Sequence, residues 1–264
     1  MKFSEMPYAR PDLDAIKQDL AAVTEELRNA PDYAAAKAAF LKKQTMEKHV
    51  NTLGTLVSIR HSIDTRDAFY DEEQQFWNNA GPEIQEVDQK WTEAMLESLF
   101  RPQFAKEYGD IMFLNAEIAM KAFSPEIVAE LQQENELTQE YGKLLASAKI
   151  PFEGGVYTIA QMGPFKLDAD DARRLAAWKA EGAWYKENQE KLDEIYDKLV
   201  HLRDAMGKKM GYEGTPPLAT TAWAETAIPR TMWKSSAPPC RNIWCRWRME
   251  STGRRQSGLG RNIP

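Results

Sequence analysis

The sequence changes character at Gly214, and this change limits which part of the chain can form a packed core. Residues 214–264 hold eight of the 34 Lys and Arg but two of the 40 Asp and Glu, so this tail carries a charge of +6 and residues 1–213 carry −12. The tail also holds both cysteines, four of the eight tryptophans and six of the 14 prolines. It shows neither helical nor strand periodicity. We therefore expect the fold to lie within residues 1–213, which we call the body, and the tail to be disordered.

The composition of the body excludes several classes of protein. No run approaches 18 uncharged apolar residues, and the first 20 residues lack the apolar stretch of a secretory signal, so we expect a cytoplasmic protein that does not enter membranes. A body without cysteine has no disulfide framework and no thiolate metal site. Its acidic excess argues against a nucleic-acid partner, because phosphate binding needs clustered cations, and the basic tail would add only weak attraction to polyanions. The oligomeric state stays open.

Apolar residues recur at helical spacing through the first half of the body. Helices are expected over about 12–29 and 32–61, and a third from an N-cap at Asp64 or Thr65 to Gly81 and Pro82, which should break it. A further helix should follow the break and include Trp91. The stripe of the first helix is Leu13, Ile16, Leu20, Val23 and Leu27.

The second half predicts more helices around one short β element. Residues 110–123 are apolar nearly all round, which is typical of an interior helix. Ser124 followed by Pro125 marks a helix start, with an end near Ala148. Gly154 and Gly155 lie between short β-prone runs and predict a hairpin. Asp168 is the expected cap of the next helix, and a last one after Asn188 should end at Gly211. The fold class is therefore mainly α, an elongated multi-helix array with one short β-hairpin.

The histidines and acidic runs do not form a metal motif. A helical zinc site needs two histidines one turn apart, as in His-Glu-x-x-His, and His49, His61 and His201 are too far apart in the sequence. We interpret each as a surface or supporting histidine. The runs Asp71–Glu73 and Glu25–Glu26 are interpreted as solvated faces.

Other catalytic motifs are also incomplete. There is no Gly-x-Ser-x-Gly, and Gly154 with Gly155 lack the lysine of a phosphate loop. Cys240 and Cys245 lack two further ligands for a metal knuckle. The body tryptophans could line a groove, but aromatic residues at helical spacing usually form core; they are Trp77, Trp91, Trp178 and Trp184. On these residues alone, the body is a helical scaffold without a complete active site.

Residues 116–213 resemble a known family. The matching segments are SPEIVAELQQENELTQEYGKLLASAKIPFEGGVYTIAQMGPF and DDARRLAAWKAEGAWYKENQEKLDEIYDKLVHLRDAMGKKMGYE, and the earlier RHSIDTRDAFYDEEQQFW fits the same family's N-terminal region. Together they resemble the oligoendopeptidase F branch of the thimet-oligopeptidase-like zinc metallopeptidases. The hairpin between helices and the closing Lys-Lys-Met-Gly-Tyr are the sharpest parts of the match.

The resemblance implies the N-terminal part of a clamshell-shaped, helical zinc endopeptidase that cleaves short peptides in a deep channel. The family's zinc ligands lie on a His-Glu-x-x-His helix and a later Glu, downstream of the matched segments, and that motif is absent from all 264 residues. No catalytic or metal residue can therefore be assigned, and no zinc is expected on this chain. Which of Trp178, Tyr185 and Tyr212 would face the channel stays open.

Two interpretations of function remain. The first is the N-terminal fragment of a zinc oligoendopeptidase, inactive alone, with an N-terminal helical region at 1–115, an oligoendopeptidase-like region at 116–213 and a frameshifted tail at 214–264. The alternative is a non-catalytic helical module that presents an amphipathic face to a protein partner.

The frameshift makes a prediction about the gene. With permitted third-base choices, codons 214–234 can be read in a neighbouring frame as YTPLGYYGMGRNCYTEDDVEK, and those from Asn242 onward as YLVPVADGIYR. Nucleotide sequencing beyond codon 213 should yield these strings in the shifted frame, and it would show whether a metal-binding helix exists downstream. Codons that encode neither string would remove the explanation.

Overall fold

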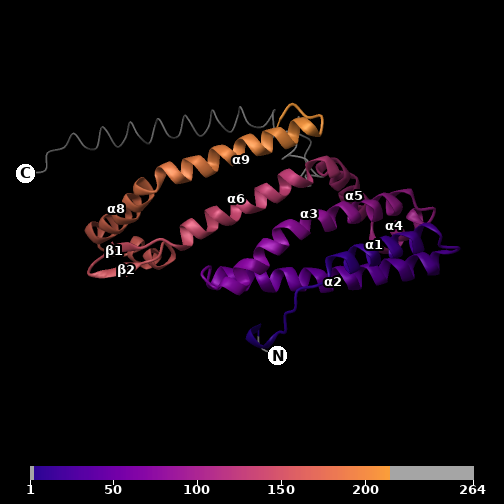
Figure 1. Ribbon diagram of the computed structural model, residues 1–264, viewed down its shortest axis with the longest axis horizontal. Helices are drawn as coiled ribbons and strands as arrows, with labels where there is room; N and C mark the ends of the chain where they lie inside the picture. The colour runs from indigo at the N-terminus through magenta and orange to yellow at the C-terminus, as the bar shows by residue number, and fades with distance from the viewer. Residues whose placement is uncertain (1–2, 215–264) are drawn as a thin grey trace, which may run out of the picture.

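The computed structural model describes residues 3–214 as an elongated array of helices (Figure 1). Within this range it contains nine α-helices and one two-stranded antiparallel sheet, which confirms the mainly α class with a short hairpin. The tail beyond Gly214, for which the sequence predicts disorder and a shifted frame, lies outside the described residues.

The helices form two groups that meet at α3 and α6 (Figure 1). We call the first group the N-terminal bundle and the second the arm. The bundle consists of η1 (Phe3–Glu5), α1 (Leu13–Arg28), α2 (Tyr33–Ile63), α3 (Ala68–Glu97), α4 (Arg101–Tyr108) and α5 (Ile111–Ala122). The arm consists of η2 (Pro125–Ile127), α6 (Val128–Ala146), β1 (Ile150–Phe152), β2 (Gly155–Tyr157), η3 (Ala160–Met162), α7 (Gly163–Lys166), α8 (Asp171–Glu187) and α9 (Gln189–Lys209).

Aspartate side chains begin α1, α2, α3 and α8 by accepting backbone N–H groups that have no partner inside the helix. Asp12 and Asp32 begin α1 and α2 as expected. Two other predicted caps are wrong. The cap of α3 is Asp67, because Asp64 instead accepts the N–H of Arg66 within the preceding turn. The cap of α8 is Asp170, since the side chain of Asp168 accepts the N–H of Asp170 and pairs with Arg173.

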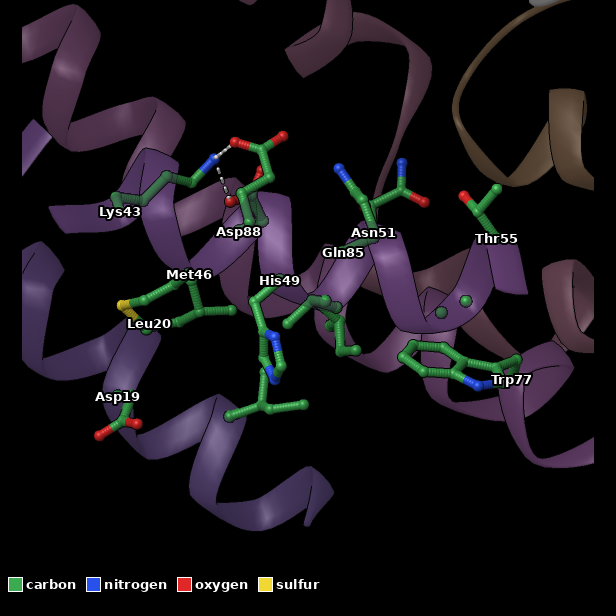
Figure 2. A pocket seen from close by; sticks show the side chains of 16 residues that line it. Asp19, Leu20, Lys43, Met46, His49, Asn51, Thr55, Trp77, Gln85 and Asp88 are labelled. Atoms are coloured by element: carbon green, nitrogen blue, oxygen red, sulfur yellow. Dashed lines mark hydrogen bonds and ion pairs between the residues drawn. The ribbon is translucent and has the colours of Figure 1, made fainter. Parts of the chain in front are cut away.

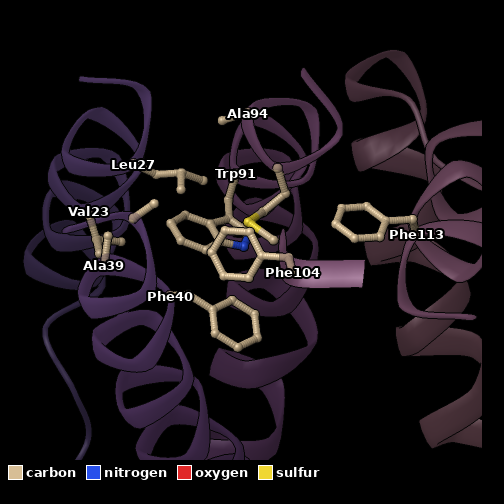
Figure 3. Close-up of a cluster of buried hydrophobic side chains, with 10 residues drawn as sticks. Val23, Leu27, Ala39, Phe40, Trp91, Ala94, Phe104 and Phe113 are labelled. Carbon is tan, nitrogen blue, oxygen red and sulfur yellow. The ribbon is translucent and has the colours of Figure 1, made fainter. Parts of the chain in front are cut away.

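The main core lies where all five helices of the bundle converge (Figure 3). Phe104 of α4 is fully buried and packs against Tyr33 and Phe40 of α2 at ring-centroid distances of 5.0 and 5.4 Å. Full burial of a side chain of this size stabilises the fold by roughly 1.5–3 kcal/mol. The buried residues of this cluster are Val23, Leu27, Ala36, Ala39, Phe40, Trp91, Ala94, Met95, Phe104 and Phe113.

Helix α5 is less buried than its sequence predicts. Only Phe113 is buried, whereas Ile111 and Leu114 are about half exposed. Its main contacts in the described part of the chain are α3 and α4, which cover one side of it. The expectation of an interior helix at 110–123 is therefore wrong for residues 3–214 taken by themselves.

Helix α3 continues through Gly81 and Pro82, where the sequence predicts a break. Proline has no N–H, so the carbonyl of Asn78, four residues earlier, loses its donor within the helix. The side-chain amide of Asn135 in α6 donates to this carbonyl at 2.9 Å. The proline ring also clashes with the Cβ of the preceding residue, which disfavours helical geometry there. Gly81 has no Cβ and so avoids part of this clash. A partner from α6 therefore compensates for the missing bond.

The arm has its own small core at the hairpin. Ile150 pairs with Tyr157 and Phe152 with Gly155, and the turn between them places Glu153 and Gly154 at positive φ. The strand residues pack on α8 and help bury Trp184. The hairpin predicted from the two glycines is confirmed, and it lies at the end of the arm away from α5 (Figure 1).

The bond from Asn135 should be coupled energetically to Pro82. Replacing Asn135 by Ala should lower the free energy of unfolding by about 1–2 kcal/mol, because the Asn78 carbonyl loses its donor. In a Pro82→Ala background the new N–H at position 82 can donate to this carbonyl. The loss of stability caused by Asn135→Ala should therefore be smaller in that background than in the parent, and the two losses should differ by about 0.5–1.5 kcal/mol. Urea denaturation of the four proteins measures this difference. Equal costs in the two backgrounds would contradict the explanation.

Candidate functional site

A groove of about 480 Å³ lies between α1, α2 and α3 (Figure 2). Its walls are mainly apolar, and Trp77 lies at one end. Gly54 of α2 faces the indole of Trp77, where an added Cβ would lie 3.5 Å from the ring. The main apolar lining residues are Ile16, Leu20, Met46, Val50, Trp77 and Ile84. A pocket of this size and lining suits an apolar ligand, but contains no nucleophile beside a base.

Lys43 is the buried charge of this groove, with 7% of its surface exposed. Its ammonium lies 2.9 Å from both the Glu47 and the Asp88 carboxylates (Figure 2). Burial opposes the charged form, but the two carboxylates outweigh it and raise the pKa of Lys43. The cation is therefore neutralised by side chains of α2 and α3. A signal for it exists in the sequence, because Lys43 follows Ala36 and Phe40 on the buried face of α2.

Glu73 of α3 fixes the segment that precedes α1. It accepts hydrogen bonds from Tyr8 Oη at 2.5 Å and from Arg10 Nε at 2.9 Å, and Trp77 Nε1 donates to Tyr8 Oη at 3.2 Å. Burial and the bond to Glu73 raise the pKa of Tyr8 to about 12. Burial alone would raise the pKa of Glu73, but Arg10 and Tyr8 outweigh it and the pKa is lowered.

Asp71 is the centre of a polar seam between α2, α3 and α6. Its carboxylate pairs with His61 Nε2 at 3.2 Å, accepts from Gln139 Nε2 at 2.9 Å and forms an ion pair with Lys143. Burial opposes the negative charge, but Lys143 and His61 prevail and lower the pKa of Asp71. Gln139 in turn accepts from Asn78 at 2.5 Å. The expectation of a solvated acidic run is therefore wrong for Asp71 and Glu73, whereas the middle residue, Glu72, is exposed.

The structure keeps the three histidines apart. His49 is exposed beside the groove, His61 is buried in the polar seam and His201 is exposed on α9. Within residues 3–214, no group of three His, Cys, Asp or Glu side chains could hold a metal ion. Across the same residues, no helix combines the length and apolar character needed to cross a membrane.

The body tryptophans divide between core and surface. Trp91 and Trp184 are buried, as expected for core residues, and the partly buried Trp77 lines the groove. Trp178 is 54% exposed, so the core interpretation is wrong for it. The reason is that α8 packs on the hairpin with the side that carries Ala177 and Trp184, and Trp178 lies about 100° around the helix from Ala177.

The two tyrosines named with Trp178 also differ in their surroundings. Tyr185 of α8 is 37% exposed, and burial of part of its ring raises its pKa. Tyr212 instead donates its hydroxyl to the Lys121 carbonyl at 2.7 Å and so joins the end of α9 to α5.

Comparisons with known proteins identify the bundle. Residues 3–123 match the family model of the peptidase M3 N-terminal domain. The chain carries the N-terminal portion of an M3-family peptidase. No curated protein sequence matches it at a significant level.

Solved structures extend the match over most of the arm. A protein assigned as oligoendopeptidase F, solved at 3.1 Å, is 36% identical with a TM-score of 0.83, over 86% of this chain and 40% of that one. Pz peptidase A with an inhibitor is 36% identical with a TM-score of 0.82, over the same shares of the two chains. A protein assigned as oligoendopeptidase F from Bacillus anthracis str. Ames is 35% identical with a TM-score of 0.83, over 87% and 42%. This M3 chain therefore spans less than half the length of these structures.

The lowered pKa values of Asp71 and Glu73 predict how stability depends on pH. Both carboxylates stabilise the folded state above their ordinary pKa values of 3.8 and 4.5, and this contribution is lost as the pH falls through the lowered folded values. We expect the Tm to stay level between about pH 7 and 5 and to fall below about pH 4.5. Glu73→Gln should be less stable at pH 7 and show a shallower fall in circular-dichroism melts. The exposed Glu72→Gln control should keep the parent slope; equal slopes for all three proteins would refute the assignment.

Proposed function

We propose that this chain is the N-terminal portion of a zinc-dependent oligoendopeptidase and does not hydrolyse peptides by itself. One observation carries the proposal. The chain matches oligoendopeptidase structures over 86% of its own length but only 40% of theirs. The activity of such an enzyme, its short-peptide substrates and a cytoplasmic location are proposed for the complete protein.

The chemistry of the described residues supports the proposal that this chain does not hydrolyse peptides by itself. In zinc peptidases the bound ion polarises the scissile carbonyl and lowers the pKa of water, which requires three protein ligands and an open position. His61 Nε2 and Asp71 Oδ1 lie 3.2 Å apart, but Lys143 already pairs with that carboxylate. Residues 3–214 contain no group of side chains that fits zinc, and the His-Glu-x-x-His motif does not occur in the sequence.

The contribution of this portion would be structural. The α6–α9 arm, joined to the bundle by the polar seam, would supply part of the wall of the peptide channel. Residues 1–115 and 116–213 would form its two regions. Residues 214–264 would replace the family sequence that follows, as the change in charge and composition at Gly214 supports.

A chimera tests whether the scaffold is competent. Residues 1–213 of this chain are joined to the remainder of the Bacillus anthracis protein. We expect the purified 264-residue chain to hold no stoichiometric zinc and to leave an internally quenched peptide uncleaved. The chimera should bind zinc and cleave the peptide.

The matched control is the chimera whose His-Glu-x-x-His glutamate is changed to Gln, which should fold and bind zinc without cleavage. A well-folded, zinc-loaded chimera without activity would refute the peptidase assignment. Stoichiometric zinc or hydrolysis in the 264-residue chain alone would refute its inactivity.

A further inference from the structure

We propose that the groove between α1, α2 and α3 binds a small amphiphilic cation, a molecule with an apolar body and one protonated amine. The apolar body lies along the walls beside Trp77, and the amine lies at the carboxylates of Glu47 and Asp88. This inference concerns the bundle alone and does not depend on the peptidase assignment.

The walls of the groove are apolar but incompletely covered. Ile16 of α1, Met46 and Val50 of α2, and Ile84 of α3 are partly exposed and line the same cavity of about 480 Å³. Contact between apolar walls and water is unfavourable, so apolar groups that displace this water bind favourably. Cavities of about 300–1,000 Å³ enclose most of a small organic molecule. The groove therefore has the size and the walls for the apolar body of such a ligand.

An aromatic side chain, Trp77, ends the groove on one side (Figure 2). Its indole is held in place, because Nε1 donates to Tyr8 Oη at 3.2 Å. A Cβ added to Gly54 would lie 3.5, 3.7 and 3.7 Å from three carbons of the ring. These distances are nearly equal, so that position lies over the face of the ring. Glycine leaves this part of the face uncovered, and an aromatic or aliphatic group of a ligand can pack on it.

Carboxylates dominate the charge at the other end. The groove is lined by the carboxylates of Asp19, Glu47 and Asp88, and Lys43 is the one Lys or Arg among its described lining residues, which leaves a net charge of −2. The Lys43 side chain is 9% exposed, whereas those of Glu47 and Asp88 are 50% and 36% exposed. A ligand that enters the groove therefore meets negative charge before it meets the lysine.

The contacts of Lys43 leave room for a second cation. Its Nζ lies 2.9 Å from Glu47 Oε2 and 2.9 Å from Asp88 Oδ1, so these contacts involve one oxygen of each carboxylate. A carboxylate can accept several hydrogen bonds, and a primary ammonium supplies three donors. An anion at the same place would be repelled, and a neutral group would gain no charge attraction. The charge of the groove therefore selects an amine.

Titration of the full chain with 4-phenylbutylamine, followed by calorimetry, tests the proposal. The neutral 4-phenylbutanol and the anionic 4-phenylbutyrate are the matched ligands. We expect the amine to bind about fivefold more tightly than the alcohol, and the acid to bind more weakly than either. The advantage of the amine should shrink between about 0.05 and 0.5 M salt. Equal affinities of amine and alcohol, or no binding of the amine, would overturn the proposal.

The indole N–H signals of isotope-labelled tryptophan locate the bound amine by nuclear magnetic resonance. The amine should shift the signal of Trp77, which is assigned by its loss in Trp77→Phe. The signals of Trp178 and Trp184, in the arm, should stay in place. Shifts in the arm without a shift at Trp77 would place the ligand elsewhere and contradict the assignment.

One pair of variants tests the charged end. Glu47→Gln should weaken binding of the amine about threefold or more and leave binding of the alcohol unchanged. The matched control is Glu194→Gln of α9, because Glu194 is also an exposed carboxylate one helical turn from its lysine partner, Lys198. This control should change the binding of neither ligand. Equal effects of the two substitutions on the amine would rule out the role of Glu47.

A second pair tests the aromatic end. Gly54→Ala should weaken the amine and the alcohol alike, by about threefold, because the methyl group covers part of the Trp77 face. The change is compatible with folding, since the added Cβ makes an ordinary contact and alanine favours a helix. The control Gly182→Ala of α8, where an added Cβ meets no atom within 4 Å, should leave binding unchanged. Unaltered binding in both Gly54→Ala and Glu47→Gln would overturn the site.

Discussion

The hydrogen bond from Asn135 to the carbonyl of Asn78 joins the two halves of the structure. Pro82 leaves this carbonyl without a donor inside α3, and an unpaired buried carbonyl is costly. The donor comes from α6, so the uninterrupted helix and the attachment of the arm depend on each other. Gln132 adds a second bond, to the Asn79 carbonyl at 3.1 Å. Helix α3 can therefore contact the bundle helices and also support the arm.

Buried or partly buried charges recur where the helices of this portion meet. Lys43 joins α2 to α3, Glu73 joins α3 to the N-terminal segment, and Asp71 joins α3 to α2 and α6. Burying an ion pair gains little net stability, because desolvation offsets most of the attraction, but removing one partner is expensive. Such pairs make incorrect helix registers costly.

The arm and the bundle differ in how completely they are covered. The bundle surrounds a continuous apolar cluster, whereas in the arm α6 buries none of its residues and α8 leaves Leu175, Trp178 and Tyr185 exposed. The similarity to the first part of oligoendopeptidase structures agrees with that difference.

The sequence by itself determined the helical class, most helix positions, the hairpin and the family, because these depend on apolar spacing, local caps and a long run of similar residues. It also indicated that no metal motif is present. Tertiary structure alone decided that α3 passes through Pro82, that Asp71 and Glu73 are paired instead of solvated, and that Trp178 faces outward. Each of these outcomes depends on a partner or a neighbouring element distant in the sequence: Asn135 for the proline, Lys143 and Arg10 for the carboxylates, and the hairpin for α8. Local spacing carries no information about such partners.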